Sequence, residues 1–275
     1  LDLVRRRVRL CDLLRRADTA MYRAKAQGRA RAESFDEELR DAVKARMETE
    51  AGLRGALRSN ELLVHYQPEV SLHDGRILGA EALIRWQHPT EGLLPAAQFI
   101  EVAEETGLVV EMGEIVLAAA CEEAAQWPGG DDGPLIRVNL AAAQLQREDT
   151  VSLVRSVLGE TGLSASRLCL EITESAVMND VARSEEILHR LKSLGVHLAV
   201  DDFGTGFSSL AYLKRFPVDA LKIDRAFVSD LGRDSSDVAF VRSIVSLAEA
   251  LGLDVVAEGV ETLEQAEILV GLGCH

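Results

Sequence analysis

The 275-residue sequence lacks the cysteine spacing, the long apolar runs and the basic surplus that mark several classes of protein. Its four cysteines, at positions 11, 121, 169 and 274, form no C-x-x-C pair, which argues against redox and zinc-ribbon sites. No signal peptide is visible, so reduced thiols and a cytoplasmic location are expected. No apolar run approaches the roughly 18 residues of a membrane-spanning helix, and no membrane span is predicted.

Positive charge is scarce, because 30 Lys and Arg stand against 45 Asp and Glu and give a net charge of −15. A protein that binds DNA nonspecifically needs basic surface against the phosphates, so binding to DNA is not expected. The charge is also uneven, since residues 1–46 carry thirteen basic and eight acidic side chains. With 47% apolar residues, the chain is long enough for one large domain and a small separate N-terminal part.

Apolar residues recur at helical spacing near the N-terminal end, at Phe35, Leu39, Val43, Met47, Leu53 and Leu57. This spacing predicts an amphipathic helix that lies on a partner surface. Two interpretations remain open. The segment 35–56 is either a helical linker or an ordinary helix that covers its own domain.

After residue 60, short apolar runs rich in β-branched residues alternate with longer helical patterns, which is typical of an α/β fold. The predicted strands are Leu62–Pro68, Ile77–Trp86, Leu135–Ala141, Arg167–Thr173, Val196–Asp202, Ala220–Asp224 and Asp254–Val260. The predicted helices are Ala97–Thr106, Glu111–Gln126, Val151–Thr161, Arg183–Leu194, Ser236–Leu251 and Thr262–Leu272. The segment His73–Arg76 is a hairpin signal, so the first strand pair is expected to be antiparallel.

Polar residues fall within or at the carboxyl ends of six of these runs: Glu81, Asn139, Glu171, Asp201 with Asp202, Lys222 with Asp224, and Glu258. In an α/β barrel these ends meet at one rim, where the active sites of such barrels lie. Two unit charges about 4 Å apart repel by roughly 4 kcal/mol at an effective dielectric constant near 20, so carboxylates gathered there need cations. Oxygen ligands without a His or Cys cluster favour Mg²⁺ or Mn²⁺ over zinc. Their number suits two ions, the usual arrangement for displacement at phosphorus.

The segment Glu81-Ala82-Leu83-Ile84-Arg85-Trp86 resembles the signature of the EAL-domain cyclic di-GMP phosphodiesterases. Six further motifs agree with that family in sequence and order: Tyr66-Gln67-Pro68, Val138-Asn139-Leu140, Glu171-Ile172-Thr173-Glu174, Asp201-Asp202-Phe203-Gly204-Thr205-Gly206, Leu221-Lys222-Ile223-Asp224-Arg225 and Ala257-Glu258-Gly259-Val260-Glu261. The resemblance covers roughly residues 57–275 and implies a TIM-like (β/α) barrel with an antiparallel first strand pair. In the family a last strand and helix follow Gly273-Cys274. We therefore expect this chain to lack them and to be part of a longer protein.

The resemblance implies a metal-dependent phosphodiesterase that hydrolyses cyclic di-GMP to linear pGpG with two Mg²⁺ or Mn²⁺ ions and a water nucleophile. The implied metal ligands are Glu81, Asn139, Glu171, Asp201, Asp202 and Glu258. Lys222 and Glu258 are implied to be catalytic, Lys222 by positioning the water and Glu258 by accepting its proton. The implied substrate contacts are Gln67, Leu83, Arg85, Asp224 and Glu261. Glu174 is implied to hold the loop after Asp201, which in the family links metal occupancy to dimerisation, so a homodimer is expected.

Residues 17–29 are similar to the last helix of a GGDEF (diguanylate cyclase) domain, which commonly precedes an EAL domain. We expect residues 1–34 to be the tail of such a domain, without cyclase activity because the cyclase signature is absent. An upstream sensor or GGDEF domain is expected in the full-length protein.

Two alternatives to the phosphodiesterase remain. The first is a catalytically impaired EAL domain that acts as a cyclic di-GMP receptor or as a protein-interaction module. The second is an unrelated Mg²⁺-dependent barrel enzyme of the enolase kind, which would not explain Gln67, Arg85 or the hairpin.

Overall fold

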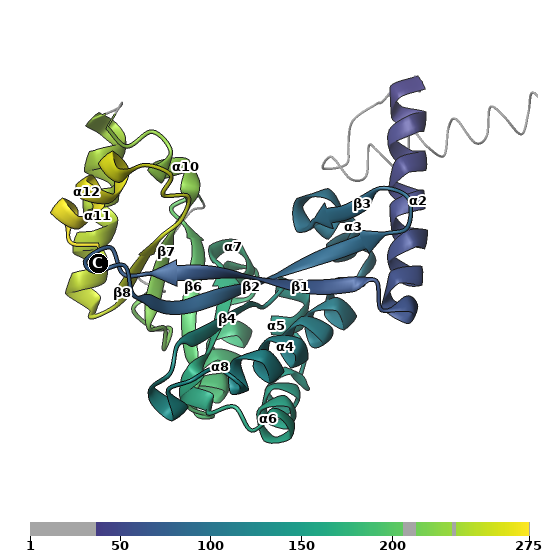
Figure 1. Ribbon diagram of the computed structural model, residues 1–275, viewed down its shortest axis with the longest axis horizontal. Coiled ribbons are helices and arrows are strands. Elements are labelled where there is room, and N and C mark those ends of the chain that lie inside the picture. Colours follow the sequence, from purple (N-terminus) through teal and green to yellow (C-terminus); the bar gives the residue numbers. More distant parts are fainter. Residues whose placement is uncertain (1–36, 206–212, 233–234, 275) are drawn as a thin grey trace, which may run out of the picture.

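The computed structural model describes residues 37–205, 213–232 and 235–274. The expected GGDEF tail at residues 1–34 and the loop segment 206–210 lie outside the described residues. The described chain forms one eight-stranded sheet in the order β1-β2-β4-β5-β6-β7-β8, with the short strand β3 paired to β2. The strands curl into a half-barrel (Figure 1), which is the expected TIM-like α/β fold. Within the described residues, β1 and β8 stand at opposite ends of the strand order.

Each predicted apolar run forms a strand. The strands are β1 (Leu62–Val70), β2 (Ile77–His88), β3 (Gly92–Pro95), β4 (Leu135–Asn139), β5 (Leu168–Thr173), β6 (His197–Phe203), β7 (Ala220–Ile223) and β8 (Asp254–Ala257). The sequence did not predict β3. The last predicted strand, Asp254–Val260, is too long, because Gly259 has a φ of +69° and turns the chain away from the sheet.

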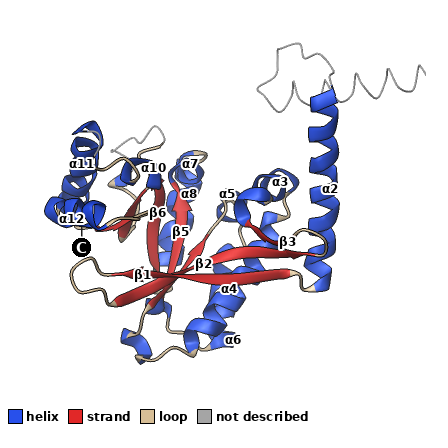
Figure 2. Cartoon of the chain, turned by 45° about the horizontal axis from the view of Figure 1, so that its top comes forward, coloured by secondary structure: helices blue, strands red, loops and turns tan. Residues whose placement is uncertain are grey.

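The first two strands form an antiparallel hairpin, as the turn signal predicts. Their register runs from Leu62 opposite Trp86 to Val70 opposite Ile77. All later neighbours along the strand order pair in parallel. Figure 2 shows the long β1–β2 hairpin crossing the parallel strands and reaching α2 (Glu37–Ser59) at its far end.

Helices alternate with the parallel strands. The remaining helices are α3 (Ile100–Thr106), α4 (Val109–Ala125), α5 (Ala142–Leu145), α6 (Thr150–Thr161), α7 (Glu174–Met178), α8 (Val181–Lys192), α10 (Arg225–Val228), α11 (Ser235–Leu251) and α12 (Leu263–Leu272). The predicted helix Ala97–Thr106 is divided in the structure, because Phe99 has a φ of −140° between a 3₁₀ turn at Ala96–Gln98 and α3. No helix in the described part of the chain is both long and apolar enough to cross a membrane.

The main core lies between the strands and helices α4, α6, α8 and α11. Ile136, Leu170, Leu198 and Leu221 project from the strands toward these helices and are almost completely buried. Each such side chain stabilises the fold by roughly 1.5–3 kcal/mol relative to an exposed one. The other face of the same strands is therefore free to carry polar residues, since side chains alternate along a strand.

A second, smaller core joins α2 to the hairpin. Leu53 and Ala56 of α2 are fully buried together with Trp86 and Phe99. The two rings meet edge to face, with centroids 5.8 Å apart and planes at 90°. A Cβ atom on Gly52 would lie only 2.6 Å from Trp86 Cη2, so glycine allows α2 to approach the ring closely.

Candidate active site

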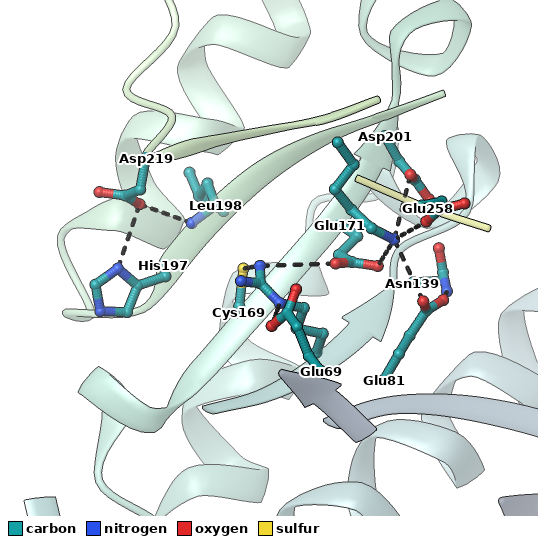
Figure 3. Close-up of polar contacts among 12 residues, drawn as sticks. Glu69, Glu81, Asn139, Cys169, Glu171, His197, Leu198, Asp201, Asp219 and Glu258 are labelled. Carbon is teal, nitrogen blue, oxygen red and sulfur yellow. Dashed lines mark hydrogen bonds and ion pairs between the residues drawn. The ribbon is translucent and has the colours of Figure 1, made fainter. Parts of the chain in front are cut away.

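Four carboxylates surround the ammonium group of Lys222. Its Nζ lies 2.6 Å from Glu171 Oε2, 2.6 Å from Glu258 Oε1, 3.2 Å from Asp201 Oδ1 and 3.3 Å from Glu81 Oε2. These acids belong to β2, β5, β6 and the residue after β8, and Figure 3 shows the four carboxylates turned toward one another. The sequence predicts these residues at one rim, and the structure brings them together.

Strand register explains how Asn139 joins the cluster. Asn139 is the Cα partner of Glu171 across the β4–β5 pair. Its amide nitrogen, Nδ2, donates a hydrogen bond of 2.7 Å to Glu81 Oε1. This contact assigns the nitrogen end of the amide to Glu81 and turns the carbonyl oxygen away from that carboxylate.

Burial and charge set the protonation of the cluster. Burial lowers the pKa of Lys222, but the surrounding carboxylates, Glu171 foremost, outweigh it and raise that pKa above its ordinary value. Burial raises the pKa of Glu171 to about 8; Glu81 and Asp201 add to the shift, whereas Lys222 opposes it. Burial also raises the pKa of Glu258, again against Lys222. The site therefore needs positive charge beyond Lys222 to keep all four carboxylates ionised at neutral pH.

Asp202 and Asp224 lie at the edge of the cluster. Asp202 has a φ of +52°, which is uncommon for a residue other than glycine. Burial raises the pKa of Asp202 to about 6, and Asp201 and a hydrogen bond from its carboxyl to that of Asp224 contribute. Asp224 also caps α10, because its Oδ1 accepts a hydrogen bond of 2.7 Å from the Ala226 amide. Asp202 thus connects the central carboxylates to the start of α10.

The hairpin places three predicted substrate residues on the same face as Glu81. Gln67 is the Cα partner of Glu81, and Leu83 and Arg85 follow Glu81 at intervals of two along β2. Arg85 Nη1 donates a hydrogen bond of 2.8 Å to the Ile84 carbonyl oxygen. These side chains therefore extend the site along the hairpin.

Within the described residues, no hydrogen bond or ion pair joins Glu261 to the central carboxylates. Its backbone amide donates a hydrogen bond of 2.7 Å to Gln265 Oε1, at the start of α12. Its side chain is exposed. Contact with a substrate remains a prediction for Glu261.

Glu174 contacts the loop that follows β6. Its Oε2 accepts a hydrogen bond of 3.2 Å from the Gly204 amide, and Gly204 has a φ of +99°. The other oxygen, Oε1, is buried without a hydrogen-bond partner among the described residues. Glu174 therefore fixes the beginning of this loop, whereas residues 206–210 lie outside the described chain.

Comparison with known proteins identifies the family. Residues 50–275 match the family model described as the EAL domain. The chain belongs to the EAL domain family. This EAL-domain chain is 45% identical over 265 residues to the bifunctional diguanylate cyclase/cyclic di-GMP phosphodiesterase MucR of Pseudomonas aeruginosa, covering 96% of the chain and 39% of that relative. It is 42% identical over 259 residues to the cyclic di-GMP phosphodiesterase NbdA of the same organism, covering 94% of the chain and 33% of that relative.

A solved structure agrees with this fold. The PaMucR phosphodiesterase in complex with c-di-GMP superimposes on the EAL-domain chain with a TM-score of 0.80 at 47% sequence identity. The match covers 83% of this chain and 93% of that one. The chain spans between 33% and 39% of the length of the two relatives named above, so the activity and partners of a whole protein are proposals here.

The donors of this EAL domain fit Mg²⁺ or Mn²⁺ in kind and in charge. They are carboxylate and amide oxygens, and one oxygen from each of four acidic side chains lies within 3.3 Å of a single point in the site, the Lys222 Nζ atom. No three His, Cys, Asp or Glu side chains among the described residues are already arranged as an ion site. The Lys222 ammonium lies where the carboxylate oxygens converge and is the cation that they share.

Two charged residues behind the cluster, Arg137 and Glu69, were not predicted from the sequence. Arg137 Nε donates a hydrogen bond of 2.6 Å to Glu69 Oε2, and Arg137 Nη1 lies 3.7 Å from Glu171 Oε1. Arg137 precedes Asn139 by two residues on β4, so both side chains project from the same face of the strand. That spacing was the signal that could have revealed Arg137.

Proposed function

We propose that this EAL domain hydrolyses cyclic di-GMP to linear pGpG, with two Mg²⁺ or Mn²⁺ ions bound at the carboxylate cluster. The observation that carries the proposal is the convergence of Glu81, Glu171, Asp201 and Glu258 on one point in a chain of this family. The relative NbdA, which is named as a cyclic di-GMP phosphodiesterase, and the PaMucR phosphodiesterase complex with c-di-GMP support the choice of substrate.

The proposed ligands of the ions are Glu81, Asn139, Glu171, Asp201, Asp202 and Glu258. Divalent cations bound there would lower the pKa of water and stabilise negative charge on the phosphate oxygens. Glu258 accepts a proton from the attacking water, since its raised pKa brings it closer to the ideal for a base at neutral pH. Lys222 keeps its proton, because its pKa is raised, and neutralises charge that develops on the phosphoryl oxygens.

The proposed reaction opens one of the two phosphodiester links of the ring. The water oxygen forms a bond to phosphorus while the bond from phosphorus to the 3′ oxygen breaks, and the 3′ oxygen takes up a proton. The product has one 5′-phosphate and one free 3′-hydroxyl, which is linear pGpG. Gln67, Leu83 and Arg85 contact the dinucleotide along the hairpin, Asp224 and Glu261 contact it from the segments that follow β7 and β8, and the Arg85 guanidinium suits a phosphate.

The proposed organisation of the chain is a GGDEF tail at residues 1–34, a helical linker at residues 35–56 and the EAL domain at residues 57–275. The name of the relative MucR, a bifunctional diguanylate cyclase and phosphodiesterase, supports an upstream GGDEF or sensor domain in the full-length protein. We also expect a homodimer, which sedimentation equilibrium would test. A monomer at all protein concentrations would contradict that expectation.

Incubation of the protein with cyclic di-GMP and Mg²⁺ or Mn²⁺, followed by chromatography of the products, tests the proposal. Linear pGpG is expected with either metal and should be absent in EDTA. A Glu171→Gln variant provides the control, because it removes one charge from the centre of the cluster. Saturable binding of cyclic di-GMP without turnover would favour the receptor alternative, and a folded protein that neither binds nor cleaves it would overturn both.

A further inference from the structure

A buried arginine lies directly behind the proposed metal site. Arg137 comes from the middle of β4, and its side chain is only 8% exposed inside the half-barrel. The guanidinium is tied to the hairpin, because Nε donates a hydrogen bond of 2.6 Å to Glu69 Oε2 on β1. A buried guanidinium needs such a partner, since an unpaired charge is costly inside a protein.

The other side of the same guanidinium faces Glu171. Arg137 Nη1 lies 3.7 Å from Glu171 Oε1, which is the carboxylate oxygen that has no hydrogen-bond partner among the described residues. The second Glu171 oxygen, Oε2, accepts a hydrogen bond of 2.6 Å from Lys222. Figure 3 shows dashed contacts leaving the Glu171 carboxylate on both sides. Glu171 is therefore held between two cations, one in the site and one behind it.

The side chains packed around Arg137 are small and leave room for its guanidinium. Cys169 is the Cα partner of Arg137 across the β4–β5 pair, and Arg137 Nη1 lies 3.2 Å from its sulfur atom. Cys169 belongs to a small buried cluster with Ala199 and Ala220. Because these side chains are small, the long Arg137 side chain fits beneath Glu171.

We propose that Arg137, anchored by Glu69, is a positioning residue that orients the Glu171 carboxylate for divalent metal binding. The inference deepens the proposed function, because it rests on Glu171 as a metal ligand. Arg137 fixes the inner oxygen of Glu171, and the outer oxygen then points at the site. Without the guanidinium, the half-buried carboxylate of Glu69 and the buried carboxylate of Glu171 lose their shared counter-charge, and Glu171 can rotate away from the site. Residues that orient metal ligands in this way typically contribute 10-fold to 100-fold in metal affinity.

Direct Mn²⁺ binding tests the role of Arg137 without substrate. Free Mn²⁺ is measured by electron paramagnetic resonance during titration of the wild type, Arg137→Met, Arg137→Lys and Arg167→Met. Arg167 is the matched control, because it is also buried, at 3% exposed, but its guanidinium donates to the Pro134 carbonyl oxygen. We expect Arg137→Met to weaken Mn²⁺ binding at least 10-fold and Arg167→Met to change it less than 2-fold.

Arg137→Lys separates charge from geometry and also covers the case in which Arg137→Met does not fold. A lysine keeps the charge but cannot contact Glu69 and Glu171 with a planar fork, so we expect Mn²⁺ binding weaker than in the wild type and tighter than in Arg137→Met. Wild-type affinity in a folded Arg137→Met would overturn the inference. If Arg137→Met does not fold, wild-type Mn²⁺ affinity in Arg137→Lys would overturn the inference. A loss of Mn²⁺ affinity in Arg167→Met as large as the loss in the Arg137 variants would also overturn it.

Kinetics distinguish this inference from the proposed function. At saturating metal, the KM for cyclic di-GMP should be unchanged in Arg137→Met, because Arg137 lies behind the metal ligands and not on the substrate side. A wild type that binds Mn²⁺ but does not cleave cyclic di-GMP would overturn the proposed function and leave the comparison of Mn²⁺ affinities valid. A wild type that cleaves the substrate, with unchanged Mn²⁺ affinity in Arg137→Met, would overturn only the inference about Arg137.

Discussion

Replacement of Lys222 by methionine should destabilise the metal-free protein strongly and the metal-bound protein much less. Lys222 is 1% exposed, and Glu171, its partner at 2.6 Å, is completely buried. Removal of one partner from a buried ion pair costs about 3–5 kcal/mol, because the remaining charges stay buried without compensation. For a domain of this size, each kcal/mol lowers the melting temperature by about 2–4 °C, so a fall of roughly 10 °C is expected in EDTA.

Two conditions should reduce this loss. Saturating Mn²⁺ supplies positive charge to the same carboxylates, so the difference between Lys222→Met and the wild type should fall to less than half. Low pH should act in the same direction. The pKa of Glu171 is already raised to about 8, and loss of Lys222 would raise it further, so protonation of Glu171 as the pH falls from 8 to 5 relieves the repulsion.

Thermal melts in EDTA and in Mn²⁺, at pH 5 and pH 8, measure these differences. Lys192→Met is the matched control, because Lys192 Nζ pairs with the two oxygens of Asp219 at 2.6 and 2.7 Å, away from the site. Its loss of stability should be the same with and without Mn²⁺. An equal loss for Lys222→Met in all four conditions would refute the view of Lys222 as the cation shared by the cluster.

Three further outcomes are expected. In EDTA, the urea midpoint of the wild type should fall as the pH rises from 5 to 8. The pKa of Glu171 is about 8 in the folded protein against an ordinary value of 4.5, so the protonation of Glu171 that stabilises the fold is lost across that window. A urea midpoint that does not change with pH would contradict this. Glu258→Gln should lower kcat by about 10²-fold to 10⁴-fold, as expected for loss of a general base, and a loss under tenfold in steady-state assays would exclude that role. Gly52→Ala should lower the free energy of unfolding by about 1–3 kcal/mol in a denaturation experiment, because the new Cβ would lie 2.6 Å from Trp86. Gly55→Ala should instead stabilise α2 by about 0.5–1 kcal/mol, because the new Cβ would have no neighbouring atom of another element within 4 Å.

The strands were predictable because each is a short, nearly continuous apolar run. β3 was missed because Gly92–Pro95 contains only four residues and both of its ends are residues that usually mark turns. The helices α5, α7 and α10 were missed for a similar reason. They have four or five residues each, which is too short to show a helical period.

The central acids of the site were predictable because each lies within or just after an apolar run, and the same pattern recurs in several runs, whereas one such charge alone has ordinary structural explanations. Their spacing around Lys222 was not, since it depends on the register between strands and on the curl of the sheet. Arg137 was missed because one charge in the middle of a short strand resembles an edge residue. Only the three-dimensional fold shows that Glu69, far away in sequence, supplies its partner.

The two faces of strand β2 line two different parts of the protein, the candidate site and the small core beneath α2. Glu81, Leu83 and Arg85 project toward the site, whereas the alternating residue Trp86 fills the space beneath α2. A single inserted or deleted residue between Glu81 and Trp86 would exchange these two faces downstream of the change. Arg85 would then point at the helix and the indole at the candidate site. One codon lost or gained would therefore damage both the chemistry and the anchorage of α2, although no acid of the central cluster would have changed.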